Sequence, residues 1–592
     1  MNRMTKTLSI LLPLVMLVSA LVAVPAPGNG VAEAQDSGLT IRVGSKQFTE
    51  QLILGNLISL ALAEFGYDAT YTQLGSTAAA HEALVAGEID VYPEYTGTGY
   101  LTFLEGAYNP AMTPSDIYNA VSQGYAQEWN LNWLEPASFN NTYCLAMTRD
   151  RAGELGIETV SDLAANADGL VFGATGEFID RPDGLPGLID AYGEFGFADV
   201  LSFDPGLKYS GLAEGELDVT TCFGTDGQIS ALDLVVLEDD QGFWPPYFAA
   251  PVINNELIAQ DPYIAVILNA VMAALDSETM SQLNWEVDGN SREPQDVAFD
   301  FFYEAVLDTI PAPEDLPAPA DVSIDVGSKQ FTEQLILGNL IALLLQEYGY
   351  DATYTQLGST AAAHEALVAG EIDVYPEYTG TGYLTFLEME YSSDLTAGAV
   401  YDAVDEAYLA EWNLDWLEPS AFNNTYCLAM VDSRAEELGI QTVSDLAANA
   451  DGLVFGATGE FIDRPDGLPG LIDAYGEFGF ADVLSFDPGL KYSGLEQGEL
   501  DVTTCFGTDG QISAMGLRVL DDDQGFWPPY NAAPVIDAEI VQTDPRVAVI
   551  LNMLMQKLDT ETMSGLNWEV DGNSQEPQDV AFQFLVDSGL IM

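Results

Sequence analysis

Two cations in the first half of the chain stand at positions suited to binding an anion. The 592 residues include only 16 Lys and Arg against 93 Asp and Glu, a net charge of −77. Lys46 follows the apolar segment LTIRVGS, and Arg181 follows another apolar segment in FGATGEFIDRPDG. In open α/β sheets, ligands bind beyond the carboxyl ends of the strands. A rare cation at such a place is a better anion-site candidate than one of many.

Aromatic side chains stand at comparable places and supply the second half of a possible site. A group of aromatic faces attracts a quaternary ammonium by cation–π contact, worth roughly 0.5 to 2 kcal/mol per face depending on desolvation. For a single tyrosine the alternative is an ordinary place in the core. Together with two cations, the set indicates a site for a zwitterion. The aromatic candidates, from VYPEYTGTGY, FNNTYC, CFGTDG and GFWPPY, are Tyr95, Tyr143, Phe223 and Tyr247, and the first segment also supplies Thr98.

Catalytic and metal chemistry find little support in the residue types. The chain has two histidines, His81 and His364, each inside TAAAHEALVAG, where a polar helix face is the simplest interpretation. One histidine in each half gives no basis for a His-based zinc site or a Ser-His-Asp triad. Gly97 and Gly99 lack the third glycine of a dinucleotide-binding loop. A Cys-His nucleophile stays formally open, but we predict a binding protein without cofactor, metal or catalytic residues.

All of these candidates occur twice. The segment VYPEYTGTGYLTFLE at 91–105 returns at 374–388, a shift of 374 − 91 = 283 residues, and other matches keep this shift along nearly the whole chain. A period this long is far above that of a solenoid, so each copy is a complete globular unit. Both sites should therefore take the same ligand. The second set is Lys329, Tyr378, Thr381, Tyr426, Arg464, Phe506 and Tyr530.

The elements expected to position these residues alternate between strand and helix. Strands are predicted at LTIRVGS, YDATYTQL and EIDVY, with helices over 50–65 and 77–87 between them. This βαβαβ order implies parallel strands with crossover helices, and the length of each copy suggests two α/β lobes. The segment IPAPEDLPAPAD is typical of a stiff extended linker. We therefore expect units at 39–309 and 322–592 joined by a linker at 310–321.

The amino terminus predicts export to the periplasm or the cell surface. Arg3 and Lys6 precede an apolar run from Leu8 to Val24 and then small residues, the pattern of a secretory signal peptide over residues 1–34. An uncleaved membrane anchor is the alternative, although the run is short for a span. Nothing later in the sequence is long and apolar enough to cross a bilayer. The negative charge argues against nucleic acid as a partner, because phosphate binding needs clustered Lys and Arg.

The four cysteines fall two per copy, and each directly adjoins a candidate aromatic residue. The separation is the same in both copies, 222 − 144 = 505 − 427 = 78. If the neighbouring aromatics face one ligand from the same lobe, the cysteines could lie on adjacent strands within disulfide distance. Buried free thiols are the alternative. For an exported protein we predict the bridges Cys144–Cys222 and Cys427–Cys505.

A known family has these motifs. The sequence resembles the substrate-binding proteins of osmoprotectant ABC importers, those for glycine betaine, proline betaine, choline or carnitine, through VGSKxFTEQ, VYPEYTGT, FNNTY, FIDRPDG, TDGQI and FWPPY. The resemblance covers both copies almost end to end. It implies an α/β fold of two tandem periplasmic-binding-protein-like (type II) units, each with two lobes around a ligand cleft. It also implies delivery of the ligand to a membrane permease driven by a cytoplasmic ATPase.

Carried over position by position, the resemblance implies an aromatic cage and a group that binds a ligand carboxylate. One position departs from the pattern: similar proteins tend to have Tyr before STDG, whereas Phe223 keeps the ring and loses the hydroxyl. The cations favour a betaine with a carboxylate over choline. An extracytoplasmic sensor with the same fold, or an enzyme on a two-lobed scaffold, is the alternative. The implied cage is Tyr95, Tyr143 and Tyr247, and the implied carboxylate group is Lys46, Thr98 and Arg181. Asn141, and Asn424 in the second copy, would lie nearby.

Overall fold

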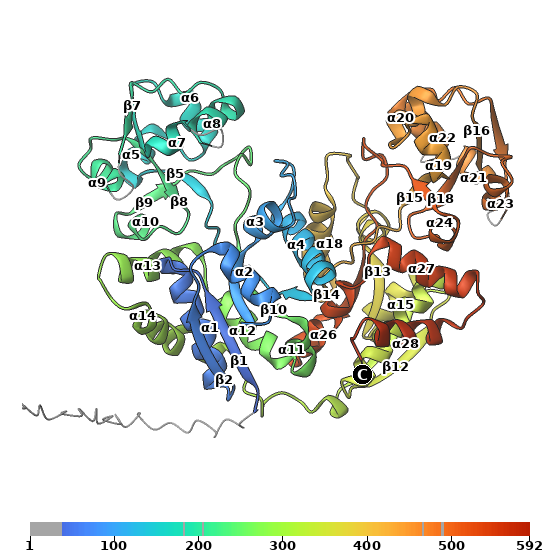
Figure 1. Cartoon of the computed structure of the whole chain (residues 1–592), viewed down its shortest axis with the longest axis horizontal. Coiled ribbons are helices and arrows are strands. Elements are labelled where there is room, and N and C mark those ends of the chain that lie inside the picture. The colour runs from blue at the N-terminus through green and yellow to red at the C-terminus, as the bar shows by residue number, and fades with distance from the viewer. Residues whose placement is uncertain (1–37, 181–183, 204–206, 464–466, 487–489, 592) are drawn as a thin grey trace, which may run out of the picture.

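The structure, a computed structural model, describes residues 38–180, 184–203, 207–463, 467–486 and 490–591. The predicted signal peptide and two candidate cations, Arg181 and Arg464, lie outside the described residues. Figure 1 shows two similar halves side by side, each with a larger lobe towards the centre and a smaller lobe at the top. The predicted architecture, two tandem α/β units of two lobes each, is confirmed.

The larger lobe of each repeat, here called lobe 1, is built on a five-stranded sheet. In the first repeat the strand order is β2 (Asp68–Gln73), β1 (Thr40–Ser45), β3 (Val91–Tyr95), β10 (Ala249–Asn254) and β4 (Leu131–Trp133). β1 pairs in parallel with β2 and β3, and β10 runs antiparallel between β3 and β4. The parallel βαβαβ order predicted from the sequence is therefore confirmed.

Two apolar clusters cover the two faces of this sheet. Successive side chains of a strand point to opposite faces, so Val91 and Tyr95 enter one cluster and Tyr92 enters the other. The first cluster is filled mainly by α1, α12, α13 and α14, and the second by α2 and α4. The helices of lobe 1 are α1 (Thr49–Glu64), α2 (Thr77–Val85), α3 (Thr96–Thr98), α4 (Pro114–Trp129), α11 (Asn255–Gln260), α12 (Tyr263–Ala273), α13 (Ser277–Asp288) and α14 (Pro294–Phe301).

The smaller lobe, lobe 2, repeats this sheet order. In the first repeat the strands are β7 (Asp199–Ser202), β6 (Val171–Ala174), β8 (Val219–Phe223), β5 (Tyr143–Thr148) and β9 (Leu234–Val236). β5 runs antiparallel to β8 and β9, whereas β6 is parallel to β7 and β8. The helices are α5 (Arg149–Leu155), α6 (Val160–Asn166), α7 (Gly176–Asp180), α8 (Leu185–Tyr192), α9 (Lys208–Ala213) and α10 (Gly227–Ala231).

The second repeat has the same elements in the same order. Its lobe-1 sheet is β12-β11-β13-β20-β14, and its lobe-2 sheet is β17-β16-β18-β15-β19. Its strands are β11 (Ser323–Ser328), β12 (Asp351–Gln356), β13 (Val374–Tyr378), β14 (Leu414–Trp416), β15 (Tyr426–Val431), β16 (Val454–Ala457), β17 (Asp482–Ser485), β18 (Val502–Phe506), β19 (Leu517–Val519) and β20 (Ala532–Asp537). Its helices are α15 (Thr332–Glu347), α16 (Thr360–Val368), α17 (Thr379–Thr381), α18 (Ala397–Trp412), α19 (Asp432–Leu438), α20 (Val443–Asn449), α21 (Gly459–Asp463), α22 (Leu468–Tyr475), α23 (Lys491–Glu496), α24 (Gly510–Met515), α25 (Ala538–Thr543), α26 (Arg546–Met555), α27 (Thr560–Asp571) and α28 (Pro577–Asp587).

One strand lies further along the chain than predicted. The sequence analysis placed a strand at 88–92, but β3 extends from Val91 to Tyr95 and contains Pro93. Proline normally weakens a strand because it has no N–H to donate. Here Pro93 faces Pro251 of β10, and β1 pairs with β3 at Val91 before the proline is reached. The missing donors therefore face each other, and the strand continues.

Two chain segments cross between the lobes of each repeat. One leads from β4 to β5 and the other from β9 to β10, and in the first repeat they meet at a bridge between Asn140 and Phe248. The N–H of Asn141 donates to the carbonyl of Tyr247 at 3.1 Å. Several candidate residues therefore lie on the crossover between lobes, where a change in lobe angle would move them.

The two repeats also contact each other through their larger lobes. α4 packs against α18 and α12 against α26, and one apolar cluster runs through lobe 1 of both repeats (Figure 1). The segment expected to be an extended linker is anchored on both sides. Tyr263 donates to the carbonyl of Pro311, and Arg546 donates to the carbonyl of Pro317, each at 2.7 Å. It is therefore a strap held against the protein rather than a free spacer.

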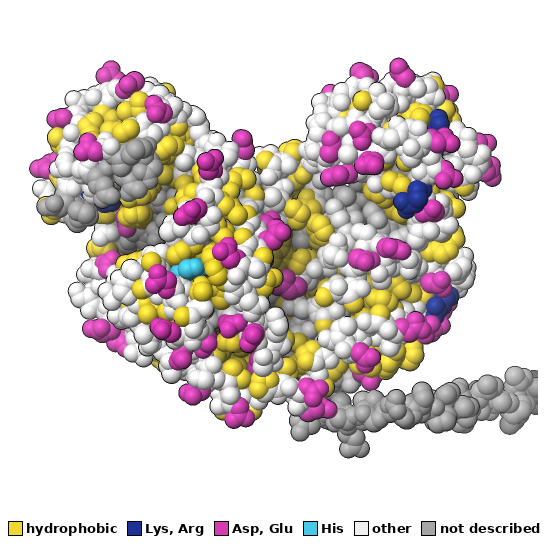
Figure 2. Space-filling model, turned by 180° about the vertical axis from the view of Figure 1, so that it is seen from behind, with side chains coloured by type: hydrophobic (Ala, Val, Ile, Leu, Met, Phe, Trp, Pro, Cys, Tyr) yellow, Lys and Arg dark blue, Asp and Glu magenta, His cyan; other side chains and the backbone are white. Residues whose placement is uncertain are grey.

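Acidic side chains are spread widely over the surface. Figure 2 shows them across the visible face of both repeats, with few Lys or Arg between them. Such a surface repels other copies of itself and keeps a protein soluble. Among the described residues, no single helix has both the length and the apolar composition to cross a bilayer, and α12 and α13 reach both only together, across an 84° bend.

Candidate functional site

A buried carboxylate, Glu50, lies where both lobes and the crossover meet. It stands in the first turn of α1 and is 3% exposed. Tyr95 Oη (2.7 Å) and Asn141 Nδ2 (2.9 Å) donate to its Oε1. The hydroxyl of Thr225 in lobe 2 and Nδ2 of Asn284 in α13 (3.1 Å) donate to its Oε2. Burial raises the pKa of Glu50, and these hydrogen bonds act in the opposite direction.

A second buried carboxylate, Glu94, is the ion-pair partner of the candidate cation Lys46. The ammonium of Lys46 forms an ion pair with Glu94, and the two residues are 4% and 0% exposed. The same ammonium lies 5.0 Å from the centroid of the Tyr95 ring. A ligand carboxylate would have to compete with Glu94 for Lys46, so the predicted contact between Lys46 and a ligand stays a prediction.

An exposed phenylalanine covers the predicted cage residue of lobe 1. Phe48 immediately precedes α1 and is 44% exposed, whereas Tyr95 is 4% exposed. The two rings stack with centroids 6.2 Å apart and planes inclined by 21°. The accessible aromatic face of this part of lobe 1 is therefore that of Phe48. The sequence analysis did not single it out.

Lobe 2 has an aromatic group around Tyr143. The ring centroids of Phe223, Phe178 and Trp244 lie 4.5, 5.6 and 6.5 Å from that of Tyr143. Tyr143 and Phe223 are direct neighbours on β5 and β8, and Phe223 is 40% exposed. The structure therefore brings two of the predicted cage residues together in lobe 2.

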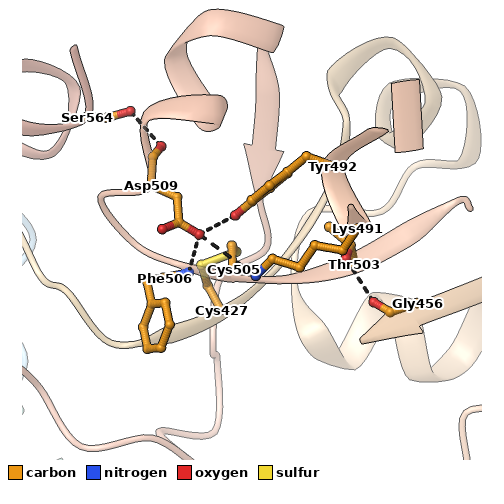
Figure 3. Close-up of a disulfide and its surroundings, with 9 residues drawn as sticks. All are labelled: Cys427, Gly456, Lys491, Tyr492, Thr503, Cys505, Phe506, Asp509 and Ser564. Carbon is orange, nitrogen blue, oxygen red and sulfur yellow. Dashed lines mark hydrogen bonds and ion pairs between the residues drawn. A yellow bond between two sulfur atoms is a disulfide. The ribbon is translucent and has the colours of Figure 1, made fainter. Parts of the chain in front are cut away.

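A disulfide joins the two strands that carry these rings. Cys144 and Cys222 are opposite each other in the ladder with Cα atoms 4.8 Å apart and are bonded. Cys427 and Cys505 have the same register, spacing and bond. Figure 3 shows the second bridge next to Phe506, the counterpart of Phe223. The covalent link is one residue from each ring, so it holds the two ring-bearing strands in register.

A half-buried aspartate holds the backbone beside this exposed ring. In the second repeat, the carboxylate of Asp509 accepts the N–H of Phe506 at 3.0 Å and the hydroxyl of Tyr492 (Figure 3). The ammonium of Lys491 lies 3.9 Å from the same carboxylate and is almost fully buried. Burial lowers the pKa of Lys491, and Asp509 opposes that change. This rare cation therefore supports lobe 2 rather than a ligand.

The remaining candidates lie at the end of β3 and on the crossover. A Cβ at Gly97 would lie 2.9 Å from the Tyr247 ring, so only glycine allows this ring to approach. Thr98 ends the short helix α3 and is half-buried. Oδ1 of Asn141 is buried and has no hydrogen-bond partner among the described residues. It is thus an acceptor that a ligand or water could use.

The second repeat reproduces this arrangement almost without change. Glu333 accepts from Tyr378 at 2.6 Å and from Asn424 at 2.9 Å, and Lys329 pairs with Glu377. Phe331 and Phe506 have the same exposures as Phe48 and Phe223. Burial lowers the pKa of Lys329, and Glu377 opposes the change. The other second-repeat candidates that the structure describes, at the positions matching Thr98, Tyr143 and Tyr247, are Thr381, Tyr426 and Tyr530.

Two cavities lie between the repeats rather than beside these rings. The larger holds about 850 Å³, and the smaller, of about 180 Å³, shares Tyr401 with it. Carboxylates line the larger cavity, but neither Phe48 nor Phe223 does. In the part of the chain that the structure describes, no group of three or more potential metal ligands occurs. The paired aromatic groups of the two lobes therefore stand as the candidate site.

Known binding proteins are similar in sequence to each repeat. A family model described as the substrate binding domain of ABC-type glycine betaine transport systems matches residues 39–304 and 322–587. A glycine-betaine-binding protein of Pseudomonas aeruginosa is 39% identical over 280 residues, which are 45% of this chain and 89% of the relative.

Two further relatives carry different descriptions. An ergothioneine transport permease/ergothioneine binding protein of Helicobacter pylori is 37% identical over 267 residues, 45% of this chain and 47% of the relative. A chemotactic signal transduction system substrate-binding protein of Halobacterium salinarum is 31% identical over 278 residues, 43% of this chain and 82% of the relative. Each match covers slightly less than half of the chain, as expected where one repeat aligns with one binding unit.

We expect Glu50→Gln to destabilise the first repeat, because an amide nitrogen would face donors that now meet a carboxylate oxygen. Loss of one or two charge-assisted hydrogen bonds should lower the midpoint of thermal unfolding by roughly 4 to 10 °C. Glu64→Gln makes the same change on the same helix, where the carboxylate accepts a bond from Tyr303 near the surface. Equal effects of the two substitutions in a melting experiment would contradict the central role of Glu50.

We also expect the native protein to contain no free thiol, because all four cysteines are bonded in the described structure. Denatured, unreduced protein treated with a maleimide should show no mass increase, and the reduced control should gain four labels. Four labels without reduction would contradict both bridges, and two labels would contradict one.

Proposed function

The chain belongs to the family of substrate-binding domains of ABC-type glycine betaine transport systems, and from that premise we propose that each repeat captures one quaternary-ammonium solute in an aromatic cage between its lobes. One observation carries this proposal: each repeat has an exposed phenylalanine on either lobe, Phe48 and Phe223 in the first. An aromatic ring left open to water on both sides of a cleft suits a ligand that supplies the missing contact.

The chemistry of the rings favours a cation without hydrogen-bond donors. An ammonium with N–H groups would need acceptors, whereas a quaternary nitrogen is recognised by ring faces alone. Closure of the lobes would bring the ring of Phe48 and the group around Tyr143 towards the same ligand. Tyr95 would then support Phe48 from behind, and Tyr247 would contribute from the crossover. The second repeat would do the same with Phe331 and its partners.

The other end of the ligand would meet polar groups near the crossover. Arg181 and Thr98 remain our candidates for binding the ligand carboxylate. Lys46 would contact that carboxylate only while it also pairs with Glu94. Asn141 offers an acceptor rather than a cation. Selectivity for a betaine over choline would therefore depend mainly on Arg181, and the same holds for Arg464 in the second repeat.

In this proposal the protein works outside the cytoplasm with a membrane permease and a cytoplasmic ATPase. Residues 1–34 would be removed as a signal peptide. The units would be 39–309 and 322–592, with 310–321 as the strap between them. The relatives are binding proteins of transport or signalling systems rather than enzymes, which supports a binding role.

A second candidate function is signalling, which the chemotaxis relative favours. A receptor of that kind would report the bound solute to a membrane partner without delivering it. Cells lacking the protein separate the two: loss of accumulation of labelled glycine betaine supports transport. Unchanged accumulation combined with loss of a behavioural response to the solute would support signalling instead.

We expect two ligands per chain with a single affinity, because the described site residues match in both repeats. Calorimetric titration of the mature protein with glycine betaine should saturate at two. Tyr143→Ala and Tyr426→Ala should each reduce this to one, and the double variant should abolish binding. Saturation at one ligand in the unaltered protein would contradict the proposal.

We further expect the two ends of the ligand to respond to different substitutions. In a chain whose second site is silenced by Tyr426→Ala, Phe48→Ala should weaken glycine betaine and choline alike, by about 1 kcal/mol. Arg181→Ala should weaken glycine betaine far more than choline, which has no carboxylate. Phe299→Ala, at a similarly exposed ring on α14, is the control. Equal losses of both ligands on Arg181→Ala would refute the assigned role of Arg181.

A further inference from the structure

The surfaces through which the two repeats meet differ in sequence, although their candidate sites do not. At three matched positions the first repeat has an uncharged polar residue where the second has a carboxylate. These pairs, each 283 residues apart, are Asn119 and Asp402, Ser122 and Asp405, and Asn132 and Asp415. Asn119 and all three aspartates line the larger cavity between the repeats. At these three positions the second repeat carries an acidic version of the same face, although the first repeat has its own carboxylates there, Asp116 and Glu135.

Across the contact, hydroxyl and amide groups of the first repeat meet acceptors of the second. Tyr118 Oη and Ser122 Oγ donate to the two oxygens of Glu418, at 2.9 and 3.1 Å. Ser115 Oγ donates to Asp402 at 2.6 Å. Glu418 also accepts from Gln556 of its own repeat at 3.0 Å. A carboxylate buried between the repeats is thus matched by donors from both sides.

Glu135, the counterpart of Glu418, has a different environment. The position matching Ser122 holds Asp405, and the position matching Gln556 holds Ala273. The hydroxyl of Tyr401, which matches Tyr118, donates to the carbonyl of Trp416 at 2.8 Å. Burial raises the pKa of Glu135, and the nearby carboxylates of Glu418, Asp415 and Asp405 raise it further. Among the described residues, side-chain donors therefore meet the carboxylate of Glu418 and not that of Glu135.

A lysine just after α26 donates hydrogen bonds to the first repeat, and the first repeat has no equivalent lysine. Lys557 donates to Asn130 Oδ1 at 2.7 Å and to the carbonyl of Ala126 at 3.2 Å. A cation at the carboxyl end of a helix is favourable, and α4 ends here. The matching residue of the first repeat is Ala274, which has neither charge nor donor.

We propose that these two faces recognise each other as unlike partners, so that the chain is a fixed pair of one first-type and one second-type repeat. The assembled chain has one such juxtaposition of carboxylates, Asp405 with Glu135, whereas a symmetric pair of second-type faces would place Asp405 against Glu418 on both sides of the contact. Two first-type faces would lack Gln556 and Lys557. If two copies of the chain exchange repeats, the first repeat of one copy should therefore pair with the second repeat of the other copy, and like repeats should not pair.

Cutting the strap in the assembled protein tests whether the faces hold without it. Residues 313–315 are exposed and can be replaced by a protease site in the full-length chain. After cleavage we expect one species containing both halves by native mass spectrometry, and no pair of like halves when two isotopically distinct samples are mixed. Separation of the halves at micromolar concentration, or formation of like pairs, would overturn the proposal.

A matched pair of substitutions then separates recognition from simple packing. Ser122→Asp gives the first repeat the acidic residue of the second and should raise the dissociation constant of the cut protein at least tenfold. Asp405→Ser makes the reverse change at the equivalent position, next to Glu135, and should leave it unchanged or lower it. Circular dichroism and melting of the uncut variants establish that both are folded. The proposal would be overturned if both substitutions raised the dissociation constant equally, or if neither raised it.

Discussion

Each repeat is organised around a buried carboxylate, Glu50 in the first and Glu333 in the second. A charged group taken out of water costs several kcal/mol unless donors replace its hydration. For Glu50 these donors come from β3, the crossover, the loop after β8 and α13, which are far apart in the sequence. Satisfying one side chain therefore draws together residues of both lobes and of the segment that joins them.

The rings of the candidate site depend on the same constraint. The hydroxyl of Tyr95 is used by Glu50, so this ring has one orientation, and Phe48 stacks on it. In lobe 2, a disulfide and the half-buried Asp509 hold the strand and backbone beside the exposed Phe506. Rigid support behind an exposed ring reduces the ordering cost that a ligand must overcome when it binds.

Features that depend on local pattern could be predicted from the sequence. The helices expected over 50–65 and 77–87 are α1 and α2, with ends that differ by at most two residues. Pairings between distant residues could not be predicted. Lys46 lies 48 residues before Glu94, and with 93 acidic residues in the chain nothing marked that one as its partner. The same abundance hid Glu50, although it stands inside a motif that the sequence analysis quoted.

The near identity of the two smaller lobes has a consequence for how the chain is made. Residues 160–212 and 443–495 are the same, and β8 and β18 share the sequence VTTCF. In an unfolded chain, the sequence around Cys222 is the same as that around Cys505, so Cys144 can pair with either. Either β8 or β18 can therefore occupy the same place in the first lobe-2 sheet. The packing and hydrogen-bond energy of the strand within the lobe therefore does not distinguish β8 from its duplicate, β18. The order of emergence does, because amino-terminal domains fold first during synthesis, and the first lobe closes while its competitor is still absent. Chains refolded from denaturant lose that order, and swapped strands between the repeats become their characteristic error.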